Sequence, residues 1–196
     1  MEQFLIFIKH HLGFLWGIID RINGWIFTMF YGSKLKKILP GVFNEFSDKH
    51  FIYRVLREED IKPLHDLITS QPPDDIKYFS PHKFDMRSLL VQFRKPAFLM
   101  MGVFDGEKMI GYFILRFFAN KRCFVGRLID TNYRGKGIGE VMNSIMYDTA
   151  WKMHFRCLST ISRNNTAVMR AHAKNGHVVI LKELRDDYLL VEFVEG

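Results

Sequence analysis

Apolar residues recur along the middle of the chain in runs of strand length, separated by short polar or glycine-containing turns. The runs cover residues 51–56, 97–104, 109–118 and 123–129. Their length and their content of Phe, Ile, Val and Tyr are typical of β-strands. Asp105-Gly106-Glu107-Lys108 lies between the second and third runs and favours a tight hairpin. The pattern predicts a first strand near residue 51 and three antiparallel strands before residue 130.

Helical spacing appears on both sides of these strands. After residue 137, apolar positions follow at intervals of three and four, which predicts a helix to about His154. These positions are Ile138, Val141, Met142, Ile145 and Met146. Shorter helices are expected over residues 61–68, 86–93 and 165–176, and further strands over 157–161, 178–181 and 188–193.

The first 41 residues are more apolar than the remainder. Lys9, Asp20 and Arg21 interrupt them, so no uncharged run reaches the length of a transmembrane helix. On a helix, Leu, Ile, Phe and Trp cover a wide side, and the polar and glycine positions gather opposite. The latter are Glu2, Gln3, Lys9, His10, Gly13, Gly17, Asp20, Arg21 and Gly24. We expect Pro40-Gly41 to end an amphipathic helical extension, residues 1–41, before a globular domain, residues 42–196.

The apolar side of this extension must be covered by a partner, and the sequence is compatible with two kinds: a membrane or a protein surface. Aromatic residues on an amphipathic helix, followed by a basic cluster, suit the interface of an anionic membrane, with the polar side in water. The cluster is Lys34, Lys36 and Lys37. Alternatively, the helix packs on its own domain or in a homodimer, where Gly13-x-x-x-Gly17 would allow a close approach.

Composition and charge narrow the classes of partner. The chain has 196 residues, of which 48% are hydrophobic, enough for one domain with a core. A net charge of +7 favours anionic partners such as coenzyme A, nucleotide sugars or an acidic membrane face. Nucleic acid is disfavoured because the basic residues are scattered and no recognition motif appears. Cys123 and Cys157 provide neither a disulfide framework nor metal spacing, which predicts a cytoplasmic protein without a metal.

The most informative stretch is Tyr133-Arg134-Gly135-Lys136-Gly137-Ile138-Gly139, where a predicted strand turns into a helix. Its glycines let several backbone N–H groups point into one concavity, and the helix N-terminus adds partial positive charge. Arg134 and Lys136 add full charges. A Walker loop is excluded because no Ser or Thr follows Lys136, and the dinucleotide fingerprint is excluded because the glycines recur at every second position.

The spacing Arg134-x-x-Gly137-x-Gly139 resembles the pyrophosphate-binding motif of the GNAT superfamily, the acetyl-coenzyme-A-dependent N-acetyltransferases. Family members also carry a later helix that begins with Asn, matched by Asn165, and ends with Gly, matched by Gly176. His172 stands where the family commonly has Tyr.

The resemblance spans about residues 51–195 and is strong from Leu128 to Gly176, whereas the first forty residues lie outside it. It implies an α+β fold with a central, mostly antiparallel sheet flanked by helices, preceded here by the amphipathic helical segment.

The resemblance also implies roles for particular residues. Acetyl-coenzyme A would be held by Arg134, Gly135, Lys136, Gly137, Ile138, Gly139 and Asn165. A backbone N–H at Leu128-Ile129 would face the thioester carbonyl, in a strand splayed from its neighbour. His172 would protonate the departing thiolate. Asp130, His82 or an ordered water would act as the base. Tyr78, Phe79 and His82 are the candidates for contact with the acceptor.

We therefore expect an N-acetyltransferase that acts on the primary amine of a small acceptor, an amino sugar or sugar nucleotide, near the inner face of a membrane. Two alternatives remain. One is acetylation of a protein or peptide amine, and the other is a non-catalytic acyl-coenzyme-A-binding module of a membrane assembly.

Overall fold

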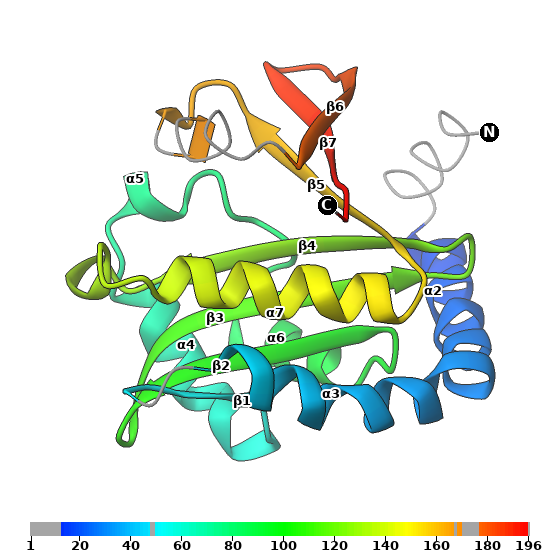
Figure 1. The fold of residues 1–196 in the computed structure, drawn as a ribbon, viewed down its shortest axis with the longest axis horizontal. Coiled ribbons are helices and arrows are strands. Elements are labelled where there is room, and N and C mark those ends of the chain that lie inside the picture. Colours follow the sequence, from blue (N-terminus) through cyan, green and yellow to red (C-terminus); the bar gives the residue numbers. More distant parts are fainter. Residues whose placement is uncertain (1–12, 48–49, 167, 170–176, 196) are drawn as a thin grey trace.

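The computed structural model describes residues 13–47, 50–166, 168–169 and 177–195, and these are built around one seven-stranded sheet (Figure 1). The strands lie in the order β1-β2-β3-β4-β5-β7-β6. Their bounds are β1 Ile52–Val55, β2 Phe98–Asp105, β3 Lys108–Phe118, β4 Arg122–Ile129, β5 Arg156–Ser162, β6 Val178–Glu183 and β7 Tyr188–Phe193. Among these described strands, β4 and β5 run parallel and every other neighbouring pair is antiparallel. The expected α+β fold with a mostly antiparallel sheet is confirmed.

Helices cover both faces of the sheet. They are α2 Gly13–Phe27, the π-helical turn η1 Thr28–Gly32, α3 Ser33–Phe46, α4 Ile61–Thr69, α5 Pro73–Ile76, α6 Met86–Phe93 and α7 Ile138–Lys152, with 3-10 turns η2 Glu58–Asp60 and η3 Thr131–Tyr133. Two of them, α3 and α7, lie on one face, and α4 and α6 lie on the other (Figure 1). Side chains alternate along β4, so Cys123 and Val125 join the apolar cluster beneath α7 and Leu128 joins the cluster on the opposite face.

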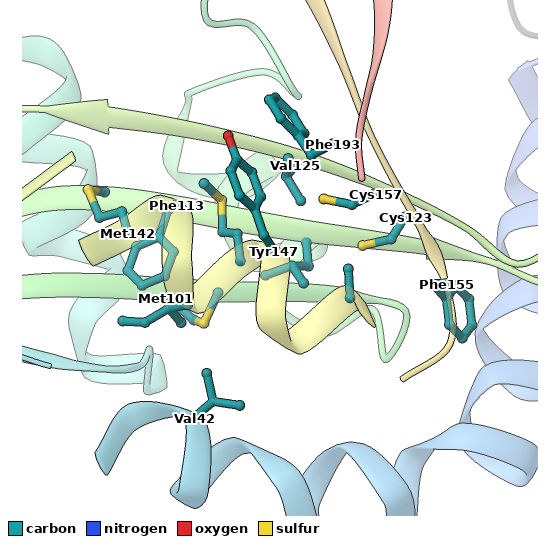
Figure 2. Packing of buried hydrophobic residues seen from close by; sticks show 14 of the residues in the cluster. Val42, Met101, Phe113, Cys123, Val125, Met142, Tyr147, Phe155, Cys157 and Phe193 are labelled. Atoms are coloured by element: carbon teal, nitrogen blue, oxygen red, sulfur yellow. The ribbon is translucent and has the colours of Figure 1, made fainter. Parts of the chain in front are cut away.

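An aromatic contact ties the C-terminal strand to α7. Figure 2 shows Tyr147 reaching from α7 toward Phe193 and Val125. The rings of Tyr147 and Phe193 stack with their centroids 4.2 Å apart. In addition, Nε1 of Trp151 donates a hydrogen bond to the Phe193 carbonyl at 3.1 Å. These contacts anchor the end of β7 at the place where β5 leaves β4.

The N-terminal helices belong to the domain core, which corrects the expected boundary after residue 41. The helix α3 passes through Pro40 and ends at Phe46. Proline removes a backbone donor from the helix interior, but Leu39 and Val42 are buried in the main apolar cluster with residues of α7. This burial outweighs the lost hydrogen bond, so the helix continues.

The helix α2 docks on the domain through a face that contains Asp20, Asn23 and the core residue Phe27. Asp20 has a side chain only 12% exposed and forms ion pairs with Lys95 and Arg116. Nδ2 of Asn23 donates to the Phe117 carbonyl at 2.9 Å. The expectation that the polar side of this helix lies in water is therefore wrong for Asp20, because its carboxylate pairs with two cations of the domain.

Replacing Leu39 tests whether α3 is part of the fold. Leu39→Ala should lower the free energy of unfolding by about 2–5 kcal/mol, the usual cost of truncating a core leucine. The control Lys37→Ala, at an exposed position of the same helix, should change it by less than about 0.5 kcal/mol. Denaturant unfolding followed by circular dichroism measures both, and equal stability of the two variants would show that α3 contributes nothing to the core.

Candidate functional site

The predicted phosphate loop lies between η3 and α7, at the end of β4. Gly135 and Gly137 have φ of +77° and +80°, a left-handed backbone that glycine adopts without strain. Gly137 is also the N-cap of α7. The first N–H groups of a helix have no partner within it, so those of Ile138 and Gly139 are directed out of the helix end beside this turn. The loop has the backbone geometry of an anion-binding site.

The two cations of the loop have different surroundings. Nζ of Lys136 lies 4.5 Å from the centroid of the Tyr133 ring. Nη1 of Arg134 donates to Oδ1 of Asp75 at 2.8 Å, and the other carboxylate oxygen of Asp75 accepts from Oγ1 of Thr131 at 2.8 Å. Hydrogen bonds from Arg134 and Thr131 lower the pKa of the Asp75 carboxyl. Asp75, on α5, therefore ties that helix to the phosphate loop.

The parallel strands β4 and β5 pair only at the start of β4 and separate before β4 reaches the loop. Within the described residues, their register joins 122–124 to 156–158, although both strands continue beyond it. Oγ of Ser159 donates to the Val125 carbonyl at 3.1 Å just past the last paired residues. Figure 1 shows β5 turning away from β4 toward the C-terminal strands.

The register of β4 decides which of its N–H groups face β5. The Asp130 N–H donates to the Ile110 carbonyl at 2.9 Å, so the even-numbered residues of β4 bond to β3 and the odd-numbered ones point to the opposite side. The Val125 carbonyl, which accepts from β5, agrees with this alternation. Of the expected pair, Ile129 therefore directs its N–H to the side of β5, whereas Leu128 directs its N–H to β3.

Arg127 is a polar residue of this region that sequence reasoning missed. By the same alternation its backbone N–H faces the side of β5. Nε of Arg127 donates to Oδ1 of Asn143, on α7, at 2.8 Å. A Cβ added to Gly139 would lie 2.9 Å from Nη1 of Arg127, so the guanidinium sits against the first turn of α7. Burial lowers its pKa. The available signal was one arginine within the otherwise apolar run 123–129.

His82 has both ring nitrogens engaged. Its hydrogen-bond network assigns the proton to Nδ1, which donates to the Lys83 carbonyl at 2.8 Å, and leaves Nε2 to accept from the Tyr112 hydroxyl at 2.8 Å. Burial lowers the pKa of the imidazole, which keeps it neutral. Its ring also meets that of Phe98 edge to face. These contacts favour a structural role for His82.

Tyr78 and Phe79 lie closer to the separating strands. The Tyr78 hydroxyl donates to the Asn164 carbonyl at 3.3 Å, which connects the segment after α5 with the segment after β5. Phe79 lies against β4, where a Cβ added to Gly126 would be 3.1 Å from its ring. Its ring also contacts Tyr112 edge to face, with centroids 5.9 Å apart. Phe79 therefore covers β4 on the face opposite α7.

Asp130 has both carboxylate oxygens engaged at the end of β4. Oδ1 accepts from the backbone N–H and the side-chain amide of Asn132, at 3.0 and 3.1 Å. Oδ2 lies 3.1 Å from Nζ of Lys108. Burial acts to raise the pKa of the carboxyl, but these hydrogen bonds prevail and hold it below its usual value. Such a carboxylate is a weak base.

The remaining expected residues lie on the segment after β5. Oδ1 of Asn165 accepts from the Val168 N–H at 3.2 Å, the capping hydrogen bond expected at the start of a helix. His172 lies outside the described residues. In the part of the chain that the structure describes, no cluster of His, Cys, Asp or Glu has the arrangement of a metal site. Within that same part, no helix combines the length and apolarity needed to cross a membrane.

Comparison with known proteins identifies the family. The sequence matches the Acetyltransferase (GNAT) family over residues 61–177. No curated protein matches the sequence.

Solved structures share the fold. The chain is similar to the PaiA N-acetyltransferase of Thermoplasma acidophilum in complex with coenzyme A, with a TM-score of 0.60, 18% identity, and coverage of 72% of this chain and 97% of that one. It is similar to the GNAT domain of the S. lividans protein PAT, with a TM-score of 0.63, 13% identity, and coverage of 72% and 88%. For the ribosomal-protein-S5-alanine acetyltransferase of Vibrio fischeri, the TM-score is 0.57, the identity 19%, and the coverage 75% and 94%.

The family match covers more than half of the chain and contains the phosphate loop, β4 and β5. The fold and the loop geometry agree with it. The chain belongs to the GNAT family of acetyltransferases, and its acyl donor is acetyl-coenzyme A.

Proposed function

We propose that the protein transfers the acetyl group to the primary amine of a small acceptor, such as an amino sugar or sugar nucleotide, beside an anionic membrane surface. The observation that carries the transfer is the phosphate loop at the end of β4, beyond the half of β4 that is not paired with β5. The loop offers N–H groups and cations to the pyrophosphate. The odd-numbered N–H groups of β4 offer an edge along which the extended pantetheine can lie as an added strand.

The backbone of β4 also supplies the donor that the reaction needs. Bound acetyl-coenzyme A provides the activated thioester. The N–H groups of Ile129 and Arg127 are fixed by the β3–β4 ladder on the side where the thioester would lie. Preorganised donors of this kind stabilise the negative charge that develops on a carbonyl oxygen under attack.

Proton transfer is assigned to His172 and to water. His172 stands where the family commonly has Tyr, and imidazole titrates near neutral pH, which suits protonation of the departing thiolate. Asp130 and His82 have their polar atoms committed to the contacts described above. We therefore assign the base to an ordered water rather than to either residue.

The acceptor side favours a small molecule. Tyr78 spans from the segment after α5 to Asn164, after β5, and Phe79 lies against β4 beside it. We take the Tyr78–Asn164 hydrogen bond, which links these two segments, as support for a small amine rather than an extended peptide. The second candidate is a peptide amine, as in the name of the Vibrio fischeri enzyme.

The membrane part of the proposal comes from α2 and η1. Because α2 docks through the face with Asp20, Asn23 and Phe27, part of its apolar surface faces outward. The exposed residues are Ile18, Ile22, Trp25, Met29 and Phe30. Trp25 and Phe30 are 64% and 63% exposed, an unusual amount for two large rings on one surface. Arg21, Lys36 and Lys37 are exposed nearby in the sequence. Aromatic side chains with adjacent cations suit the interface of an anionic bilayer.

The phosphate loop is tested by Gly137→Asp. The new residue would be strained at φ +80° and would place negative charge against the pyrophosphate, so calorimetry should detect no acetyl-coenzyme A binding. Gly106→Asp is a matched control, because Gly106 also has positive φ, with open space around it, in the β2–β3 turn. It should bind as the parent does. Parental affinity in Gly137→Asp would refute the assignment of the loop.

The acceptor is tested with the parent by measuring coenzyme A release against amino sugars, sugar nucleotides and short peptides. Release with the sugars supports the proposal. Release with peptides alone would make the protein a peptide acetyltransferase. Tight binding of acetyl-coenzyme A without release to any amine would favour the binding module.

The role of His172 is tested by His172→Phe. Loss of a general acid should lower kcat by about 10²- to 10⁴-fold while acetyl-coenzyme A affinity changes little. A variant with the parental kcat from about pH 6 to pH 9 would remove His172 from the mechanism.

Membrane binding is tested by flotation of the full chain with vesicles of anionic lipid. The parent should float, rising salt should weaken binding, and Trp25→Ser with Phe30→Ser should abolish it. Val91→Ser, at an exposed apolar position on α6, is the control and should still float. A parent that stays in the aqueous fraction as a dimer, and becomes monomeric with the two serines, would identify a subunit interface instead.

A further inference from the structure

The Arg127 guanidinium is a partly buried charge without a counter-ion among the described residues. Its Nε has Asn143 as a partner. Among the described residues, neither Nη1 nor Nη2 has a hydrogen bond, and no carboxylate forms an ion pair with the group. Buried arginines in proteins are almost always paired, because removing a charge from water is costly. Holding this charge partly out of water without a counter-ion is therefore expected to lower the stability of the protein without ligand.

The neighbouring positions on the same face of β4 show what would suit the fold better. Cys123 and Val125 point to the same side as Arg127 and lie in the main apolar cluster beneath α7. Tyr147, also on α7, is the other polar group that interacts with the guanidinium. An apolar side chain at position 127 would continue this packing. Packing alone gives no reason for the arginine.

The direction of the side chain supplies a reason. Nη1, Cζ and Nη2 of Arg127 would be the three nearest atoms to a Cβ on Gly139, at 2.9, 3.1 and 3.3 Å. Gly139 is in the first turn of α7 and is the last glycine of the phosphate loop. The hydrogen bond from Nε to Asn143 fixes the plane of the guanidinium in that position. The free Nη groups are thus held beside the N–H groups that form the anion site.

We propose that Arg127 is a cofactor-binding residue whose guanidinium is the counter-ion of the pyrophosphate of acetyl-coenzyme A, reaching it from β4 beside the first turn of α7. The inference rests on the proposed site for the cofactor. It adds a third cation to Arg134 and Lys136, and the only one of the three that is held beneath α7. Charge-assisted hydrogen bonds between a guanidinium and a phosphate are stronger than hydrogen bonds between neutral groups.

The test compares Arg127→Met with the parent, using two ligands and one stability measurement. Calorimetry gives the Kd for acetyl-coenzyme A and for S-acetylpantetheine, which lacks the pyrophosphate. Arg127→Met should weaken acetyl-coenzyme A by about ten- to hundredfold and leave S-acetylpantetheine within about twofold. The Tm of the protein without ligand should equal or exceed that of the parent, because an unpaired buried charge is lost.

Two further variants sharpen the result. Arg127→Lys keeps the charge but loses the planar fork, so its Kd for acetyl-coenzyme A should fall between those of the parent and Arg127→Met. Lys62→Met removes one positive charge from the exposed side of α4 and should bind both ligands as the parent does.

Two outcomes would overturn the proposal. One is parental affinity for acetyl-coenzyme A in Arg127→Met. The other is a result in which both variants, Arg127→Met and Arg127→Lys, bind the two ligands equally more weakly than the parent and also have a lower Tm. That result would show that the arginine has a structural role. Failure of the proposed site is distinguishable, since the parent itself would then bind neither acetyl-coenzyme A nor S-acetylpantetheine.

Discussion

The separation of β4 from β5 is the constraint on which the site depends. A parallel pair needs hydrogen bonds along its length to stay together, and here the ladder joins residues 122–124 to 156–158 before the strands part. Beyond that point β4 is still paired with β3 along its other edge. Its odd-numbered N–H groups therefore have no neighbouring strand in the described part of the chain to bond to, and they are available to a ligand. The stack of Tyr147 on Phe193 holds the second half of the sheet at its angle.

Much of this arrangement is readable from sequence, because it is set by local chemistry. The glycines at 135 and 137 demand a backbone that few other residues adopt, and the strand and helix around them have clear periodicities. The N-terminal boundary was not readable. Pro40 is a strong local signal, but burial of Leu39 and Val42 against α7 overrides it, and that partner lies about a hundred residues away along the chain. Arg127 was missed because β4 is apolar on both faces, so the sequence does not show which face of the sheet the arginine side chain lies on.

The site also shows two ways of holding an arginine. Arg134 is exposed and already shares its charge with Asp75, so a phosphate at the loop competes with a carboxylate for it. Arg127 has no such competitor among the described residues. Arg134 thus links the loop to α5, whereas the Nη groups of Arg127 have no hydrogen bond among the described residues.

The place where α2 docks has a geometric consequence. Asp20 and Asn23 bind the end of β3, at Arg116 and Phe117, whereas the phosphate loop follows the far end of β4 (Figure 1). Eight residues of extended strand separate the two ends, a length of roughly 26 Å. A bilayer touching α2 would stand at about that distance from the chemistry. An acceptor attached to lipid would therefore have to carry its amine on a long polar head, well clear of the headgroup layer, in order to be acetylated.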